Sequence, residues 1–208
     1  MALAGDSILV TPGSGATVAT ETVSAKEHQV MMEADRSGHI KGSKPTWTVA
    51  SQNSANVAAA RTTHFDLFNA AASGVVLRVL GVYIVPTLAA VTGVGLTWEI
   101  IRTSAVGTGG TTRTPEKHDS GNAALPGGVT SRSKPTGGAT TSATLYYPNA
   151  SSEETSPFAG LSSILNHVPQ VGPDAQALVL REGEGLKVDQ TTSSSVGSTN
   201  IVIVFTVE

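Results

Sequence analysis

The sequence predicts an all-β protein, a β-sandwich of jelly-roll or related type. Short apolar or alternating segments recur along the 208 residues between turns rich in glycine and proline, and no helices alternate with them. Serine, threonine and glycine make up about a third of the chain, which suits short strands and turns better than long helices. We expect about eight to ten strands, and two packed sheets can bury them.

The strongest strand signal is a pair of apolar segments in the first half of the chain. Residues 75–85 carry apolar side chains at both even and odd positions, which predicts a strand covered on both faces. Residues 96–103 read as the returning strand of a hairpin, with Arg78 opposite Glu99. Residues 200–207 repeat the doubly apolar pattern and are expected to form a second central strand. Such strands require a second sheet or a neighbouring subunit.

The domain organisation is predicted to be an N-terminal arm at residues 1–26 and a single sandwich at 27–208. The arm mixes isolated apolar residues with proline and glycine, so it cannot bury enough apolar area alone. Residues 105–144 lack periodicity and are expected to be a long Gly/Ser/Thr-rich loop insertion with one or two short strands. A short helix is expected at 156–165. The other expected strands are residues 27–33, 44–50, 63–69, 145–147, 175–181 and 186–188.

Composition and charge exclude several classes of function. The net charge of -3, without a basic run, gives no electrostatic footprint for nucleic acid. The absence of cysteine excludes disulfides, thiolate zinc sites and thiol catalysis. The most apolar window, residues 75–91, contains Arg78 and Pro86, and the N-terminus does not resemble a signal peptide. We therefore expect no nucleic acid or membrane partner, and a soluble protein made in the cytoplasm.

Two motifs resemble parts of enzymes. Gly5-Asp-Ser-Ile8 is similar to the opening block of a serine esterase, but only four residues precede it and no Asp-x-x-His pair lies near the C-terminus. An acidic cluster could ligate calcium or supply paired glycosidase carboxylates, yet basic residues and glycines around it favour a solvated turn. The cluster comprises Asp174, Glu182, Glu184 and Asp189. We assign no catalytic residue and expect a protein that is not an enzyme.

No cofactor or metal site is predicted. The five histidines, His28, His39, His64, His118 and His167, are far apart and do not have the spacing of metal ligands on one element. Among the aromatic residues, Trp98 and Tyr83 lie in apolar segments and are expected in the core. Trp47 and the pair Tyr146 and Tyr147 are left as exposed side chains that could stack on sugar rings.

Three stretches resemble small structural proteins of tailed-bacteriophage particles, particularly head-decoration (cement) proteins and related head or tail accessory proteins. They are Glu27-His-Gln-Val-Met-Met-Glu33 with the polar turn after it, Phe68-Asn-Ala-Ala-Ala-Ser-Gly74 before the apolar hairpin, and Leu180-Arg-Glu-Gly-Glu-Gly-Leu186 followed by the final strand. The resemblance covers most of the chain. It implies a β-rich, cofactor-free and oligomeric protein, often trimeric.

The leading hypothesis is a non-enzymatic structural protein that binds and stabilises a phage capsid shell as a decoration protein. Its partner would be the major capsid protein or another virion protein, and it would act as a homotrimer on a virion assembled in the host cytoplasm. The residues expected to contact the partner are Ile8, Leu9, Val10, Val18 and Trp47. The alternatives are a glycan-binding or host-attachment module, a tail or connector accessory protein and, with least support, an esterase or glycosidase.

Overall fold

The computed structural model describes most of residues 44–208 and a short part of the N-terminal region. The described residues are 20–23, 26–29, 44–52, 54–55, 57, 61–88, 94–146, 149–152, 165–166, 177–192 and 197–208. The chain divides into two compact units, Met1–Ser43 and Lys44–Glu208. The first contains the antiparallel strands β1 (Thr20–Val23) and β2 (Lys26–Gln29). The predicted boundary at residues 26 and 27 falls inside β2.

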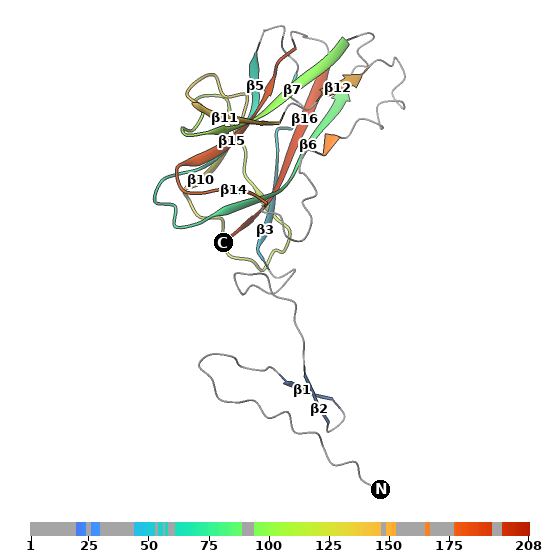
Figure 1. Cartoon of the computed structure of the whole chain (residues 1–208), viewed down its shortest axis with the longest axis vertical. Helices are drawn as coiled ribbons and strands as arrows, with labels where there is room; N and C mark the ends of the chain where they lie inside the picture. Colours follow the sequence, from blue (N-terminus) through green and yellow to red (C-terminus); the bar gives the residue numbers. More distant parts are fainter. Residues whose placement is uncertain are drawn as a thin grey trace. The chain divides into compact units, whose positions relative to one another are not determined.

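The second unit is a β-sandwich of two antiparallel sheets (Figure 1). The β5 sheet has the order β11-β7-β15-β5-β10-β8, and β12 also pairs with β7. The β16 sheet has the order β13-β6-β16-β3-β9, with β14 also paired to β6 and β4 to β16. Because the described residues contain no helix, the all-β prediction is confirmed.

The strands of the β5 sheet are β5 (Thr62–Asn69), β7 (Val94–Thr103), β8 (Thr111–Thr112), β10 (Val129–Ser133), β11 (Thr141–Tyr146), β12 (Asn149–Ser152) and β15 (Glu184–Gln190). Those of the β16 sheet are β3 (Thr46–Ala50), β4 (Ser54–Ala55), β6 (Leu77–Leu88), β9 (Glu116–Lys117), β13 (Leu165–Asn166), β14 (Leu178–Leu180) and β16 (Ser198–Val207).

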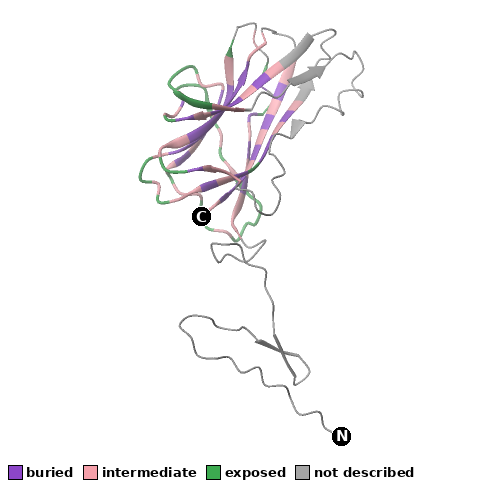
Figure 2. Ribbon diagram, in the orientation of Figure 1, coloured by how far each residue is buried: buried purple, intermediate pink, exposed green. Residues whose placement is uncertain are grey.

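The hydrophobic core lies between the two sheets, where alternate side chains of the central strands meet. Figure 2 shows buried residues along the central strands of both sheets. The β5 sheet contributes Phe65, Leu67, Trp98, Ile100, Leu186 and Val188, among others. The β16 sheet contributes Trp47, Val49, Leu77, Val79, Val82, Ile84, Ile201, Ile203 and Phe205. In β16 the intervening Val202 and Val204 are only half-buried, so the prediction that this strand is covered on both faces is wrong. Its central position, between β6 and β3, is as predicted.

A β-bulge in β6 explains why its apolar residues occupy both even and odd positions. The register against β16 shifts at Leu80, which is the extra residue of the bulge and is 46% exposed. The shift inverts the alternation, so core residues are odd-numbered before it and even-numbered after it. These residues are Leu77, Val79, Val82 and Ile84. The doubly apolar pattern therefore marks a change of phase and not a strand buried on both faces.

The predicted hairpin does not form, because β6 and β7 belong to different sheets. Arg78 is therefore not opposite Glu99, as was expected, because the two residues lie in different sheets. It forms an ion pair with Glu208 instead, with 2.5 Å between Nε and Oε1. Glu99 lies opposite Asp189 and forms an ion pair with Arg61. The pattern located both strands correctly, but the pairing is decided by strands far along the chain.

The segment 105–144, which was predicted to be a long loop with one or two short strands, contributes strands to both sheets. It contains β8, β9, β10 and the start of β11. An additional bridge joins Thr108 to Gly137. Most of these strands are too short for an alternation of apolar and polar residues to be visible in the sequence. The turn before β8 has positive φ angles of 68° at Gly109 and 67° at Gly110, which glycine adopts without strain. Of the other predictions, residues 30–33 of the first strand and 156–164 of the helix lie outside the described residues.

Candidate functional site

A cluster of charged residues occupies the face of the β5 sheet that points away from the core. It comprises Arg61, Asp66, Glu99, Lys187 and Asp189, hereafter the charged cluster. Asp66 and Lys187 are directly opposite each other on β5 and β15. Although an outward face is normally solvated, Asp66 is 1%, Lys187 8% and Asp189 0% exposed. Buried charges of this kind are found where they are paired or where they serve a site.

Asp189 is the most heavily bonded member of the cluster. The hydroxyl of Thr63 donates to its Oδ1 at 2.7 Å. Its Oδ2 lies 3.2 Å from Nζ of Lys187 and 3.7 Å from a guanidinium nitrogen of Arg61. The same guanidinium reaches Glu99 at 2.7 Å. Asp189 and Glu99 thus share one arginine, and Asp189 also neutralises the buried lysine.

Asp66 fastens a second layer of chain over this face. The layer consists of residues 104–110 and 134–140, hereafter the cover. The main-chain N–H of Gly107 donates to Oδ2 of Asp66 at 2.6 Å. A Cβ on residue 107 would lie 2.7 Å from that oxygen and 2.8 Å from Cβ of Pro135, so only glycine fits between the two. Gly107 is therefore packed tightly between Asp66 on the sheet and Pro135 in the second segment of the cover, residues 134–140.

The environment of Asp66 favours its neutral form. Burial raises the pKa of Asp66 to about 6, against the opposing effects of the Gly107 hydrogen bond and the positive charges of Lys187 and Arg132. Oδ1 is buried and has no hydrogen-bond partner among the described residues. The carboxyl group therefore has one oxygen bonded to the cover and one free to carry a proton.

A cavity of about 460 Å³ opens beside the charged cluster. One wall is Arg61, Thr62 and Thr63 at the start of β5, and the other is residues 134–139 of the cover. The cavity forms where the chain turns away from β5 at the end of β10. Lys134 still donates its N–H to the carbonyl of His64 at 3.0 Å, but its φ of 50° is left-handed and Pro135 follows. Three threonines, one arginine and one lysine are among the residues that line this volume, which is the size of small-molecule sites.

Trp47 is not the exposed aromatic residue that we predicted. It is 3% exposed and lies in the core, with its ring stacked on Phe205 at a centroid distance of 6.3 Å. The reason is the alternation of β3, which turns Trp47 and Val49 inward. A ring in this position cannot stack on a sugar. The expected contact residues Ile8, Leu9, Val10 and Val18, and the side chains of Tyr146 and Tyr147, lie outside the described residues.

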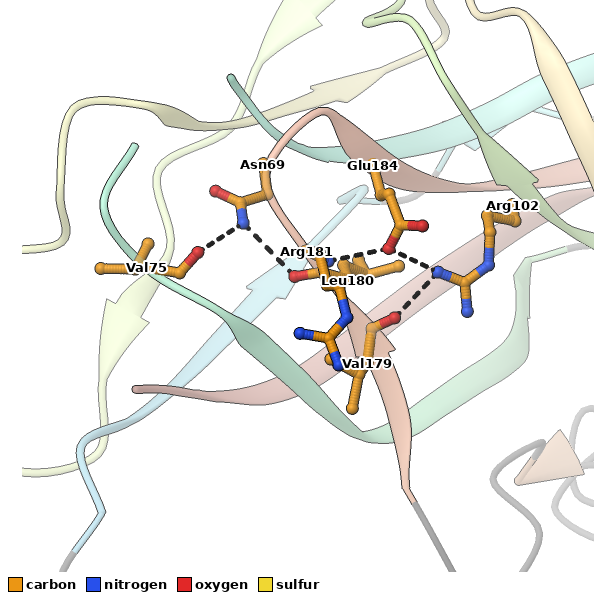
Figure 3. Close-up of polar contacts among 7 residues, drawn as sticks. All are labelled: Asn69, Val75, Arg102, Val179, Leu180, Arg181 and Glu184. Atoms are coloured by element: carbon orange, nitrogen blue, oxygen red, sulfur yellow. Dashed lines mark hydrogen bonds and ion pairs between the residues drawn. The ribbon is translucent and has the colours of Figure 1, made fainter. Parts of the chain in front are cut away.

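The acidic cluster predicted around residue 183 does not stay together. Glu182 accepts hydrogen bonds from the main chain at Gly74 (2.8 Å) and Ala72 (3.3 Å). Glu184 accepts from the N–H of Arg181 and pairs with Arg102, each at 2.8 Å (Figure 3). Asp189 belongs to the buried charged cluster instead, and Asp174 lies outside the described residues. The turn carboxylates thus serve to fix the turn.

Asn69 reinforces the same region from β5. Its Nδ2 donates to the carbonyls of Val75 at 2.9 Å and Leu180 at 3.3 Å, and Arg102 donates to the carbonyl of Val179 at 2.9 Å (Figure 3). These bonds connect the two sheets at one end of the sandwich.

His64 is a buried core residue. Its Nε2 lies 2.8 Å from Oε1 of Gln190, and its ring meets Trp98 edge-on at 5.0 Å. Burial lowers the pKa of His64 to about 4, so it is neutral at physiological pH. No group of three or more histidine, aspartate or glutamate residues in the described ranges could hold a metal ion.

Comparison with known proteins gives no family for the chain. No family model, curated protein or solved structure matches it. Within the residues that the structure covers, there is no helix with the length and hydropathy needed to cross a membrane. The site must therefore be interpreted from its own chemistry. Its donors are those that bind hydroxyl-rich or anionic groups, and its buried carboxyl group can exchange a proton.

Sequence reasoning missed Arg61, Asp66, Gly107 and Lys134 as members of a site. One signal was present: Asp66 sits between Phe65 and Leu67 in a strand with a further phenylalanine after it. A charged residue in so apolar a segment suggests a paired or functional group.

Proposed function

We propose that this protein is a non-enzymatic structural component of a phage particle, a decoration protein that binds and stabilises the capsid shell. The observation that carries the proposal is the division of the chain at residues 43 and 44. Residues 44–208 bury a hydrophobic core between their own two sheets. In this proposal the N-terminal unit lies along a neighbouring protein.

The sandwich is, in this proposal, a jelly roll. Its strand pairs are nested: β3 pairs with β16, β5 with β15, β6 with β13 and β14, and β7 with β11 and β12. Nested pairs result when one long double-stranded ribbon is wrapped into two sheets, which is the arrangement of jelly rolls in viral capsid proteins.

The protein would act as a homotrimer, in which three arms that each bind the partner with modest affinity together give strong binding. Each arm adds main-chain hydrogen bonds and buried apolar side chains at the partner's surface, and avidity combines several arms. Exposed Leu80 and half-buried Val202 and Val204, on the outer face of the β16 sheet, supply apolar surface that supports self-association. The partner would be the major capsid protein or another virion protein. In the alternative form of this proposal, the chain is itself an accessory protein of the tail or connector.

Deletion of residues 1–19 is the test. We expect the truncated protein to keep its circular dichroism spectrum and melting temperature while its binding to purified empty shells falls at least tenfold, because several apolar side chains worth roughly 1.5 to 3 kcal/mol each are lost. A full-length variant with Ile8, Leu9 and Val10 changed to serine should behave like the deletion, and Ser14→Ala should bind normally. Equal decoration of shells by the truncated and full-length proteins would refute the proposal. Binding to tails and not to shells would favour the tail accessory protein over the capsid decoration protein.

The cavity favours one second candidate, a glycan-binding or host-attachment module. Threonine hydroxyls and cationic groups are the donors that sugar hydroxyls and carboxylates require, and the cavity can hold about a monosaccharide or disaccharide. A glycan array distinguishes this function from shell binding. Specific glycan binding that is lost in Thr136→Val, which alters the cavity wall, and kept in Thr112→Val, at an exposed position in β8, would establish it.

A further inference from the structure

The cover is bonded to the β5 sheet at several points. Lys134 donates its N–H to the carbonyl of His64 at 3.0 Å, and Arg132 donates to the carbonyl of Gly109 at 3.3 Å. The bond from Gly107 to Asp66 differs from these in that its acceptor is a buried carboxyl group.

The two strips of the cover, residues 104–110 and 134–140, are joined to each other: Thr108 donates to Gly137 at 2.6 Å, and Thr136 donates to Thr108 at 2.9 Å. Ser104 also donates to Thr140 at 3.0 Å. Because of these bonds, the strips would move together. The bond from Gly107 to Asp66 ties them to the face of β5.

We propose that Asp66 is a proton-controlled latch, which holds the cover closed when it is protonated and loosens it when it is ionised. Protonation at Oδ1 removes a buried charge without breaking the bond that Oδ2 accepts from Gly107. Ionisation leaves a carboxylate with a single hydrogen bond in a site closed to water, and lifting the cover would hydrate it. The charge state of one side chain therefore biases two positions of the same segment.

The charges around Asp66 set how strongly the latch responds. Lys187 lies opposite it on β15 and Arg132 opposite it on β10, and both favour the ionised form. Asp189, also on β15, disfavours it. In the cover itself, residues 104–110 carry no titratable side chain, and residues 134–140 carry only Lys134. Burial outweighs the two cations, since the pKa of Asp66 rises to about 6 when the cover is closed.

The sign of the effect follows from linkage. A carboxyl group whose pKa is higher in the closed state binds more protons when closed, so closure weakens as the pH rises from the open-state pKa to the closed-state pKa. With an ordinary aspartate pKa of about 4 in the open state, opening should increase about tenfold between pH 5 and 7.5. The cavity wall at residues 134–139 is part of the cover, so the cavity changes with the same proton.

Amide hydrogen exchange of the full-length protein between pH 5 and 7.5 tests the latch. After correction for intrinsic exchange rates, protection at Gly107, whose N–H bonds to Asp66, should fall about tenfold as the pH rises. Thr108 and Thr136 should change less, because their N–H groups bond within the cover. Protection at Ile203 in β16 should fall less. In Asp66→Asn, which keeps an oxygen acceptor but cannot ionise, the pH dependence should disappear.

Asp119→Asn is the matched control. Asp119 is exposed and accepts a hydrogen bond from the N–H of Gly121 at 2.9 Å, so it resembles Asp66 in its bonding but not in its burial. Its variant should retain the pH dependence at Gly107. Constant protection of Gly107 across the range in the unmodified protein, or an unchanged pH dependence in Asp66→Asn, overturns the proposal.

A measurement on the unmodified protein keeps the test valid if Asp66→Asn does not fold. The carboxyl carbon of Asp66 can be titrated by NMR, and it should show a midpoint near pH 6 that the amide shift of Gly107 follows. A midpoint at the ordinary value for aspartate, or a Gly107 amide that does not titrate with it, overturns the latch.

Discussion

Replacing Asp189 by alanine is expected to lower the free energy of unfolding by about 3 to 5 kcal/mol. The carboxylate is fully buried and lies 3.2 Å from Nζ of Lys187, whose side chain is itself only 10% exposed. Removing one partner leaves the other charge in a site from which water is excluded, and the cost of an unpaired buried charge exceeds the value of the pair. Denaturant unfolding at neutral pH measures the difference.

A double variant separates the loss of the pair from the loss of packing. In Lys187→Met combined with Asp189→Ala, no lysine is left unpaired, so much of the stability should return. Thr63→Val, which removes only the hydroxyl that donates to Asp189, should cost about 1 kcal/mol. If the double variant were as unstable as the sum of its two single variants, the ion pair would not be the cause.

Phe205→Ala should destabilise the sandwich by about 3 to 5 kcal/mol. Phe205 is fully buried in the central strand β16, opposite Trp47 on one side and Val79 on the other, and its ring stacks on the tryptophan with 15° between the planes. Truncation would leave a cavity among these three strands that the rigid sheet cannot fill. Phe205→Leu, which keeps most of the volume, should cost much less.

Thermal unfolding of the two variants gives the comparison. Tryptophan fluorescence, to which Trp47 and Trp98 both contribute, should also change in both variants if the stacking is as described. Equal stability of the alanine and leucine variants would contradict the close packing assigned to this position.

The fold class could be predicted from the sequence because it depends on local patterns. Residues 63–69 and 200–207 showed their strand character directly, and β5 and β16 occupy those positions. Pairing could not be predicted in the same way. Arg78 was placed opposite Glu99 because a hairpin is the simplest connection, whereas its partner Glu208 lies at the end of the chain. One extra residue at Leu80 was enough to make a half-buried strand look doubly buried.

The candidate site depends on the same kind of long-range information. The strand at residues 63–69 was predicted, but Asp66 is buried by Gly107 and Pro135, in a segment that was predicted to be a loop. Asp189 looked like part of a solvated turn because Glu182 and Glu184 are close to it in sequence. When residues far away in the sequence bury one face of a strand, that burial cannot be predicted from the residues of the strand itself.

The nested pairing of strands also determines when the molecule can fold. β16 lies between β6 and β3, so these two strands have no common neighbour until residues 198–207 have left the ribosome. Earlier, both expose open edges and apolar faces, which favour pairing with other chains. The contacts that close the sandwich join residues from its two ends, a topology that folds slowly. Synthesis is therefore the vulnerable period in the life of this protein, and loss of its last strand should lead to aggregation, whereas loss of residues 1–19 should not.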